Sequence, residues 1–79
     1  MVWVYIIQSV QDKGYYIGIT KDTKVRLNSH NAGKVRSTKK RKPFILLYTE
    51  KFLNYNEART REIEIKSYKG GNELRKLIS

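Results

Sequence analysis

Five polar side chains have types and spacing that could act on a phosphodiester bond. Tyr5 and Tyr16 stand inside short apolar runs, and Arg26 and His30 follow one helical turn apart. A guanidinium grips phosphate oxygens bidentately, and an imidazole can carry a proton near neutral pH. Glu62 then falls on the apolar side of a later helical segment, where a carboxylate needs a cationic or metal partner. The set predicts chemistry on phosphate.

The composition limits which metal such a site could use. The chain has seven Asp/Glu residues against seventeen Lys/Arg and no cysteine, so it lacks a thiolate site and has little scope for an acidic cage. Glu62 shares an apolar stripe with Ala58 and Ile65, within ~60° on a helix, whereas Glu57 and Glu64 point toward solvent. A single carboxylate suits Mg²⁺ or Mn²⁺, which keep most of their waters and take substrate phosphate oxygens as ligands.

Each of these residues also has a purely structural interpretation. The tyrosines can be core residues with hydroxyls at the rim, and the Arg26/His30 pair can be a solvated helix flank with a histidine favoured by the dipole. Lys66, one turn after Glu62, can neutralise its carboxylate. Asn72 follows two glycines and is either a helix N-cap or a phosphate-binding amide.

Positive charge dominates the chain and concentrates in one segment. The formal net charge is +10, and residues 34–42 hold six basic side chains in nine positions. Such density attracts polyanions because each neutralised phosphate releases counterions. The segment therefore predicts contact with nucleic acid, although a solvated basic loop has the same composition. The substrate-binding candidates here are Lys34, Arg36, Lys39, Lys40 and Arg41.

The pattern of short runs predicts one small α+β domain over residues 1–79, with no second domain. No apolar run approaches the ~18 residues of a membrane span, and no signal peptide is evident, so we expect a soluble cytoplasmic protein. The expected fold is a three-stranded antiparallel sheet flanked by helices, in the order β-β-α-(α)-β-α-α. We expect strands over 2–8, 15–20 and 44–49. The first helix is expected to begin at Asp22 or Thr23 and to end at about residue 31, and a short helix is expected before Pro43. Two further helices are expected, one over 57–68 with an Asn54 or Asn56 cap and one over 72–78.

Details of the hairpin and the first helix bear on the site. Alternation along strands places Trp3, Tyr5 and Ile7 on one face, and Tyr16, Gly18 and Thr20 on a face of the next strand. If the register pairs these faces, the two tyrosines are neighbours. Gly18 then either leaves open space for a ligand beside the Tyr16 hydroxyl or marks a bulge. Gly14 is expected to supply the φ > 0 position of the turn, and Gly33 to stop the first helix. That helix is expected to pack through Val25, Ser29 and Ala32.

The ordered set of motifs resembles the GIY-YIG nuclease superfamily. The pattern runs V-Y-I, then Y-I-G-I-T, then K-D-x-x-x-R-L-x-x-H and E-A-x-x-x-E-x-x-I-K, over nearly the whole chain. It is most similar to small stand-alone members related to the N-terminal catalytic domain of the excinuclease of nucleotide-excision repair. Trp3-Val4-Tyr5 replaces Gly-Ile-Tyr, and Ile19 stands where the repair nuclease has lysine. The resemblance implies a metal-dependent DNA endonuclease with a role in repair or recombination.

The resemblance also assigns roles to particular residues. Tyr16 would orient the attacking water and act as general base, which requires a neighbour or a metal-bound hydroxide to draw off a phenol proton that ordinarily titrates near pH ~10. Arg26 would neutralise charge on the phosphate, and His30 would orient Tyr16 or relay its proton. Tyr5 would position Tyr16, Glu62 would hold Mg²⁺ or Mn²⁺, and Asn72 matches a late asparagine of the family.

Two functions without catalysis share the same charge. A basic module could bind DNA or RNA without cutting it, but such a binder gains nothing from a carboxylate facing the site. A small protein could instead dock on an acidic partner through residues 34–42, which leaves Glu62 and the tyrosines unexplained. Because no recognition domain is evident, a partner protein is expected to supply substrate recognition.

Overall fold

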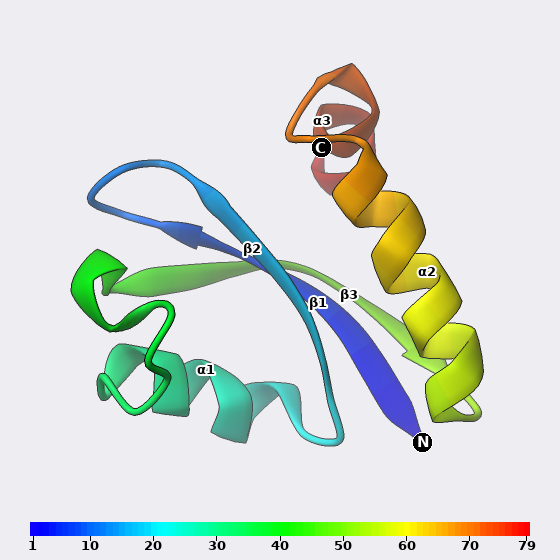
Figure 1. Cartoon of the computed structure of the whole chain (residues 1–79), viewed down its shortest axis with the longest axis horizontal. Coiled ribbons are helices and arrows are strands. Elements are labelled where there is room, and N and C mark those ends of the chain that lie inside the picture. The colour runs from blue at the N-terminus through cyan, green and yellow to red at the C-terminus, as the bar shows by residue number, and fades with distance from the viewer.

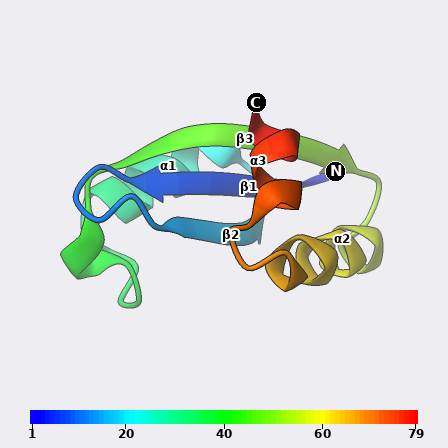
Figure 2. The ribbon, with the colours of Figure 1, turned by 90° about the horizontal axis from the view of Figure 1, so that it is seen from above.

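A three-stranded antiparallel sheet forms the centre of the computed structural model, which describes all of residues 1–79. Strand β1 (Val2–Ser9) lies between β2 (Tyr15–Thr20) and β3 (Phe44–Phe52), as Figure 2 shows from above. The central position suits β1 because its β-branched and aromatic residues are apolar on both faces. The expected sheet and its antiparallel pairing are confirmed.

Helices cover both faces of this sheet. Helix α1 (Thr23–Asn31) lies on one face, and α2 (Tyr55–Ser67) and α3 (Asn72–Ile78) lie on the other (Figure 1). Alternation along β1 divides the core accordingly. Val2, Val4 and Ile6 pack with α2 and α3, whereas Tyr5 and Ile7 belong to a second cluster on the α1 side.

The helix ends follow local sequence signals. The Val25 amide donates to Asp22 Oδ1 over 3.1 Å, which caps α1, and the Glu57 amide donates to Asn54 Oδ1 over 3.0 Å, which caps α2. Gly33 adopts φ 75° after α1. A short 3₁₀ turn, η1 (Lys39–Arg41), follows before Pro43. None of the helices is long and apolar enough to cross a membrane.

Three expectations about local structure are wrong. Lys13, not Gly14, takes the positive φ of the β1–β2 turn (64°), because the Gly14 amide is held by Asp12 Oδ1 at 2.7 Å. Asn72 does not cap α3: Gly71 is the N-cap, and no side chain caps that helix. Strand β3 continues past Thr49 to Phe52 because β1 offers it pairing partners as far as Val2.

Helix α1 also packs through a different side from the one expected. Val25 is 60% exposed, and it is Leu27 and His30 that turn toward the sheet. The apolar content of α1 is too small to fix its rotation, and the polar interactions of His30 replace a conventional apolar stripe. This rotation matters because it brings Arg26 and His30 over the tyrosines.

Candidate active site

The two tyrosines lie side by side on the α1 face of the sheet. Antiparallel pairing sets Tyr5 opposite Gly18 and Ile7 opposite Tyr16. The Tyr5 and Tyr16 rings are 6.3 Å apart between centroids, within the range of favourable aromatic contact. Alternation along the strands therefore predicted this neighbourhood correctly.

Gly18 does not leave open space beside the Tyr16 hydroxyl. A Cβ at this position would lie 2.6 Å from the Tyr5 hydroxyl and 2.7 Å from its Cζ, so the Tyr5 ring already occupies the volume. The glycine is needed because any side chain at this position would collide with the Tyr5 phenol. Its contribution to a site is thus to admit Tyr5 between the strand and α1.

A chain of hydrogen bonds links the tyrosine to α1 and to the segment after it. Arg26 Nε donates to the Tyr5 hydroxyl at 3.3 Å, and this hydroxyl lies 3.0 Å from His30 Nε2. His30 Nδ1 lies 2.7 Å from Thr38 Oγ1, which also donates to the Val35 carbonyl at 3.4 Å. We refer to Arg26, Tyr5, His30 and Thr38 as the buried relay.

The donors and acceptors of the buried relay fix the direction of its protons. Thr38 uses its proton on the Val35 carbonyl, so its oxygen accepts from His30 Nδ1–H. His30 Nε2 is then unprotonated and accepts from the Tyr5 hydroxyl, whose oxygen accepts from Arg26. The opposite tautomer would give the Tyr5 oxygen two donors and leave its own proton without a partner. The geometry therefore assigns a neutral Nδ1–H imidazole.

Burial makes this proton arrangement persistent. His30 and Thr38 have no exposed surface, and Tyr5 is 2% exposed. Burial, assisted by the positive charge of Arg26, lowers the pKa of His30 to about 4. Burial also raises the pKa of Tyr5 against the opposing effect of Arg26, with smaller contributions from Tyr16 and Glu62. At neutral pH, Tyr5 is thus a protonated donor and His30 a neutral acceptor.

Two expectations for His30 are corrected by these contacts. Its imidazole does not titrate near neutral pH, because a buried site beside a guanidinium disfavours the charged form. Its hydrogen bond goes to Tyr5, whereas it meets Tyr16 through the rings, with centroids 4.9 Å apart in an edge-on arrangement. His30 therefore contacts Tyr16 through ring packing, and its centroid also lies 5.7 Å from that of the Phe44 ring.

Thr38 is the residue of the buried relay that sequence reasoning missed. Thr38 lies within the basic segment 34–42, in which the charged side chains are the dominant sequence signal and an uncharged hydroxyl has no distinguishing pattern. The turn before η1 carries Thr38 inward while its neighbours Ser37, Lys39 and Lys40 stay exposed. No periodicity marks such a residue, since it depends on one irregular turn.

Arg26 is the member of the buried relay that also interacts with the more exposed Tyr16. Its pKa is raised, mainly by the hydrogen bond to Tyr5 and further by Tyr16, against the effect of burial. Tyr16 is half-buried, whereas Tyr5 is enclosed. Of the two phenols, Tyr16 is therefore the one that a substrate could reach, with a guanidinium beside it.

Glu62 occupies the buried stripe of α2, as the helical pattern predicted. It is 6% exposed and shares the buried side with Ala58 and Ile65. Its Oε1 accepts from Arg59 at 2.6 Å, and its Oε2 pairs with Lys66 at 3.3 Å. The Lys66 pairing was foreseen and the Arg59 pairing was not.

This carboxylate fits a hard divalent cation. The two cations that cover Glu62 are about half exposed (49% for Arg59 and 51% for Lys66), so a divalent cation could take the place of either beside the buried carboxylate. No cluster of three or more carboxylate or histidine side chains lies nearby or elsewhere in the chain. Glu62 therefore offers a single carboxylate that a hard divalent cation could use as a ligand.

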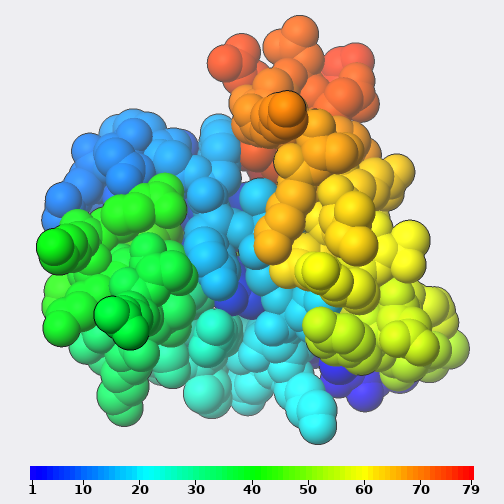
Figure 3. Space-filling view, viewed as in Figure 1, coloured from blue at the N-terminus to red at the C-terminus, as the bar shows by residue number.

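The remaining basic candidates divide into exposed and engaged residues. Lys34, Arg36, Lys39 and Lys40 are exposed or partly exposed. Arg41 instead pairs with Asp12 at 2.9 Å and lies over the Phe44 ring at 5.6 Å, which ties η1 to the sheet. Figure 3 shows β2 between two lobes, one formed by segment 33–42 in green and the other by α2 in yellow and orange. Asn72 is exposed at the first position of α3.

Comparison with known protein families gives a match over nearly the whole chain. The GIY-YIG catalytic domain matches residues 1–74. The chain belongs to the GIY-YIG family. This match covers Tyr5, Tyr16, Arg26, His30 and Glu62 and confirms the resemblance seen in the sequence. The GIY-YIG domain is a nuclease domain, which accords with phosphate chemistry at the site.

Similar members of the family are also small proteins. The UPF0213 protein SH2523 of Staphylococcus haemolyticus is 39% identical over 74 residues, covering 92% of this chain and 89% of that protein. The UPF0213 protein SAV0488 of Staphylococcus aureus has the same identity and coverage. The solution structure of the UPF0213 protein BH0048 from Bacillus halodurans is 32% identical, with a TM-score of 0.53 over 96% of this chain and 80% of that one.

The depressed pKa of His30 predicts a loss of stability in acid. The unfolded chain binds a proton near the usual pKa of 6.5, whereas the folded chain resists it down to about 4. The contribution of neutral His30 is complete above pH ~6.5 and disappears as the pH falls to ~4, a loss of roughly 2–3 kcal/mol in unfolding free energy. Urea unfolding across this range should show a clearly steeper fall than in His30→Gln, which retains the carboxylate titrations. Equal slopes would contradict the assignment.

Proposed function

We propose that this protein is a divalent-metal-dependent endonuclease that hydrolyses phosphodiester bonds in DNA, in the cytoplasm, during repair or recombination. One observation carries the proposal: Arg26 is hydrogen-bonded to the enclosed Tyr5 and lies beside the reachable Tyr16. A structural core would gain little from a guanidinium held between two phenols. A nuclease gains a preorganised positive charge next to a group that can orient water.

The chain's own residues have separable roles in the reaction. Tyr16 orients the attacking water and, in its phenolate form after the phenol proton has passed to solvent, accepts the proton of that water as general base. Arg26 binds non-bridging oxygens and neutralises the charge that develops on them. Tyr5 holds Arg26 through a hydrogen bond, and His30 packs against the Tyr16 ring. Thr38 fixes His30 through a hydrogen bond to its other nitrogen. Tyr5, His30 and Thr38 act through others, and their burial keeps them from the substrate.

Glu62 would hold the metal that GIY-YIG nucleases generally use. A bound Mg²⁺ or Mn²⁺ supplies Lewis acidity toward a phosphate oxygen and the leaving 3′ oxygen. Arg59 and Lys66, which pair with Glu62 and are about half exposed, would bind phosphate oxygens of the substrate close to this carboxylate.

Substrate affinity comes from the exposed basic side chains. Lys34, Arg36, Lys39 and Lys40 lie on the lobe opposite α2, so DNA crossing β2 would meet positive charge on both sides (Figure 3). Asn72 is an additional polar candidate at the start of α3. These contacts carry no base readout, so a partner protein would supply target selection.

Substitution of Glu62 tests the metal-dependent reaction. Glu62→Gln keeps the shape of the side chain but removes its charge, so cleavage of nicked or branched labelled DNA should fall about 10²-fold or more in Mg²⁺ or Mn²⁺. DNA binding should persist, and chelator should abolish cutting by the unsubstituted protein. Glu64→Gln is the matched control, because Glu64 faces solvent on the same helix. Binding without cutting, identical in all three proteins, would leave a DNA-binding module.

The two tyrosines provide a second, internal comparison. Tyr16→Phe should reduce the single-turnover cleavage rate by about 10²–10⁴ with little change in stability, because it removes the proposed base. Tyr5→Phe should lower the unfolding free energy by about 1–3 kcal/mol, since His30 Nε2 and Arg26 Nε each lose a partner, and should slow cleavage less. If Tyr5→Phe proves the more damaging to cleavage, the assigned roles are reversed.

A further inference from the structure

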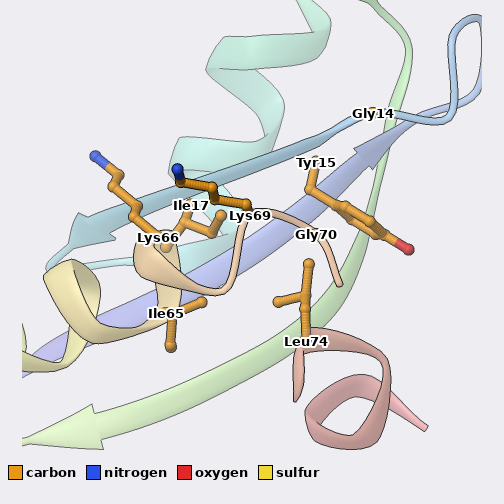
Figure 4. A pocket seen from close by; sticks show the side chains of 8 residues that line it. All are labelled: Gly14, Tyr15, Ile17, Ile65, Lys66, Lys69, Gly70 and Leu74. Atoms are coloured by element: carbon orange, nitrogen blue, oxygen red, sulfur yellow. The ribbon is translucent and has the colours of Figure 1, made fainter. Parts of the chain in front are cut away.

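A cleft on the other face of the sheet is not used by the roles assigned above. It has a volume of about 360 Å³ and lies between β2 and the turn that joins α2 to α3. Ile17, Ile65 and Leu74 form an apolar floor, the Tyr15 ring forms one wall, and Lys66 and Lys69 line the opposite rim (Figure 4). Cavities of roughly 300–1,000 Å³ with apolar walls and few polar groups are typical of small-ligand sites.

The local backbone holds the wall and rim in place. Lys69 adopts φ 51° and Gly70 φ 71°, which reverses the chain sharply after α2. A Cβ on Gly70 would lie 3.7 Å from the Tyr15 ring, so the Gly70 backbone passes close to this ring. A non-glycine residue in the left-handed region is uncommon, and here it sets the Lys69 side chain along the cleft.

The cleft is connected to the proposed metal carboxylate through one side chain. Lys66 lines the cleft, and its Nζ lies 3.3 Å from Glu62 Oε2. The distance from the Glu62 carboxylate to the rim of the cleft is therefore about the reach of one lysine. A ligand that has a phosphate near Glu62 and a flat group one step away could occupy both places.

Charge and shape together select the chemistry of the occupant. The rim carries two ammonium groups in a chain of net charge +10, which favours an anionic ligand. The aromatic wall and apolar floor favour a flat, weakly polar group. A nucleotide combines a phosphate with a π-faced base, and a base can enter such a cleft only when it is unpaired.

We propose that this cleft receives an unpaired nucleobase of the DNA strand, stacked on Tyr15, with its phosphate bound by Lys66 and Lys69. The site deepens the proposed nuclease function and rests on it for the identity of the substrate. It predicts a preference for strands with unpaired bases near the cut, independent of base identity, because every base has a π-face.

The test compares a base-containing single strand with an abasic strand of the same length in chelator, where no cleavage occurs. The unsubstituted protein should bind the base-containing strand about tenfold more tightly. Tyr15→Leu, which keeps an apolar wall, should bind both strands equally, and Tyr15→Phe should retain the preference. Lys39→Gln should weaken both complexes alike, because Lys39 is exposed on the opposite lobe, away from the cleft, where only the phosphate backbone would reach it.

A second measurement does not depend on any variant folding. An oligonucleotide carrying 5-iodouracil, irradiated in complex with the unsubstituted protein, should cross-link to Tyr15 in peptide mass spectrometry. Cross-links confined to segment 34–42, or an unchanged strand preference in Tyr15→Leu, would overturn the proposal. The preference present without metal-dependent cutting would uphold the cleft and reject the nuclease, whereas no DNA binding at all would reject both.

Discussion

The hydrogen bond between the Tyr5 hydroxyl and His30 Nε2 is the interaction on which the rest of this site depends. It joins the central strand to α1, a helix with so little apolar surface that packing alone would not fix its rotation. Thr38 sets the imidazole tautomer by accepting from His30 Nδ1. Arg26 forms the other end of the hydrogen-bond chain by donating to the Tyr5 hydroxyl. Every buried side-chain polar atom has a hydrogen-bond partner, and these hydrogen bonds offset the free-energy cost of removing the polar groups from water.

The second constraint is the small size of the sheet. It has three strands and two covered faces, and β2 forms one of its edges. The phenols and Arg26 lie on the α1 face, whereas Glu62 and the cleft belong to α2 on the other face. A substrate strand crossing β2 would meet both sets, because β2 carries Tyr16 and α2, which carries Glu62, packs against β2. In the proposed reaction, the burial of Tyr5 suits a positioning role and the accessibility of Tyr16 suits contact with the substrate.

The features that follow a regular period could be predicted from the sequence, and those set by tertiary contacts could not. Strand alternation placed Tyr16 beside Tyr5, and helical periodicity placed Glu62 on a buried stripe. Alternation gives a face but no volumes, so it could not show that the Tyr5 ring fills the space over Gly18. The contact of Thr38 with His30 could not be predicted, because it depends on an irregular turn and not on a periodic pattern. The low pKa of His30 likewise follows from burial that no local signal reveals.

The protonation state of His30 is the most direct test of this account, and His30 is the only histidine in the chain. Long-range ¹H–¹⁵N correlation spectra at pH 7 should show a neutral imidazole with the proton on Nδ1 and an unprotonated Nε2. Thr38→Val should weaken this tautomer, and Thr38→Ser should retain it, because only the hydroxyl accepts from Nδ1. A proton on Nε2, or a charged ring at pH 7, would contradict the buried relay and the positions it gives to Arg26 and Tyr16.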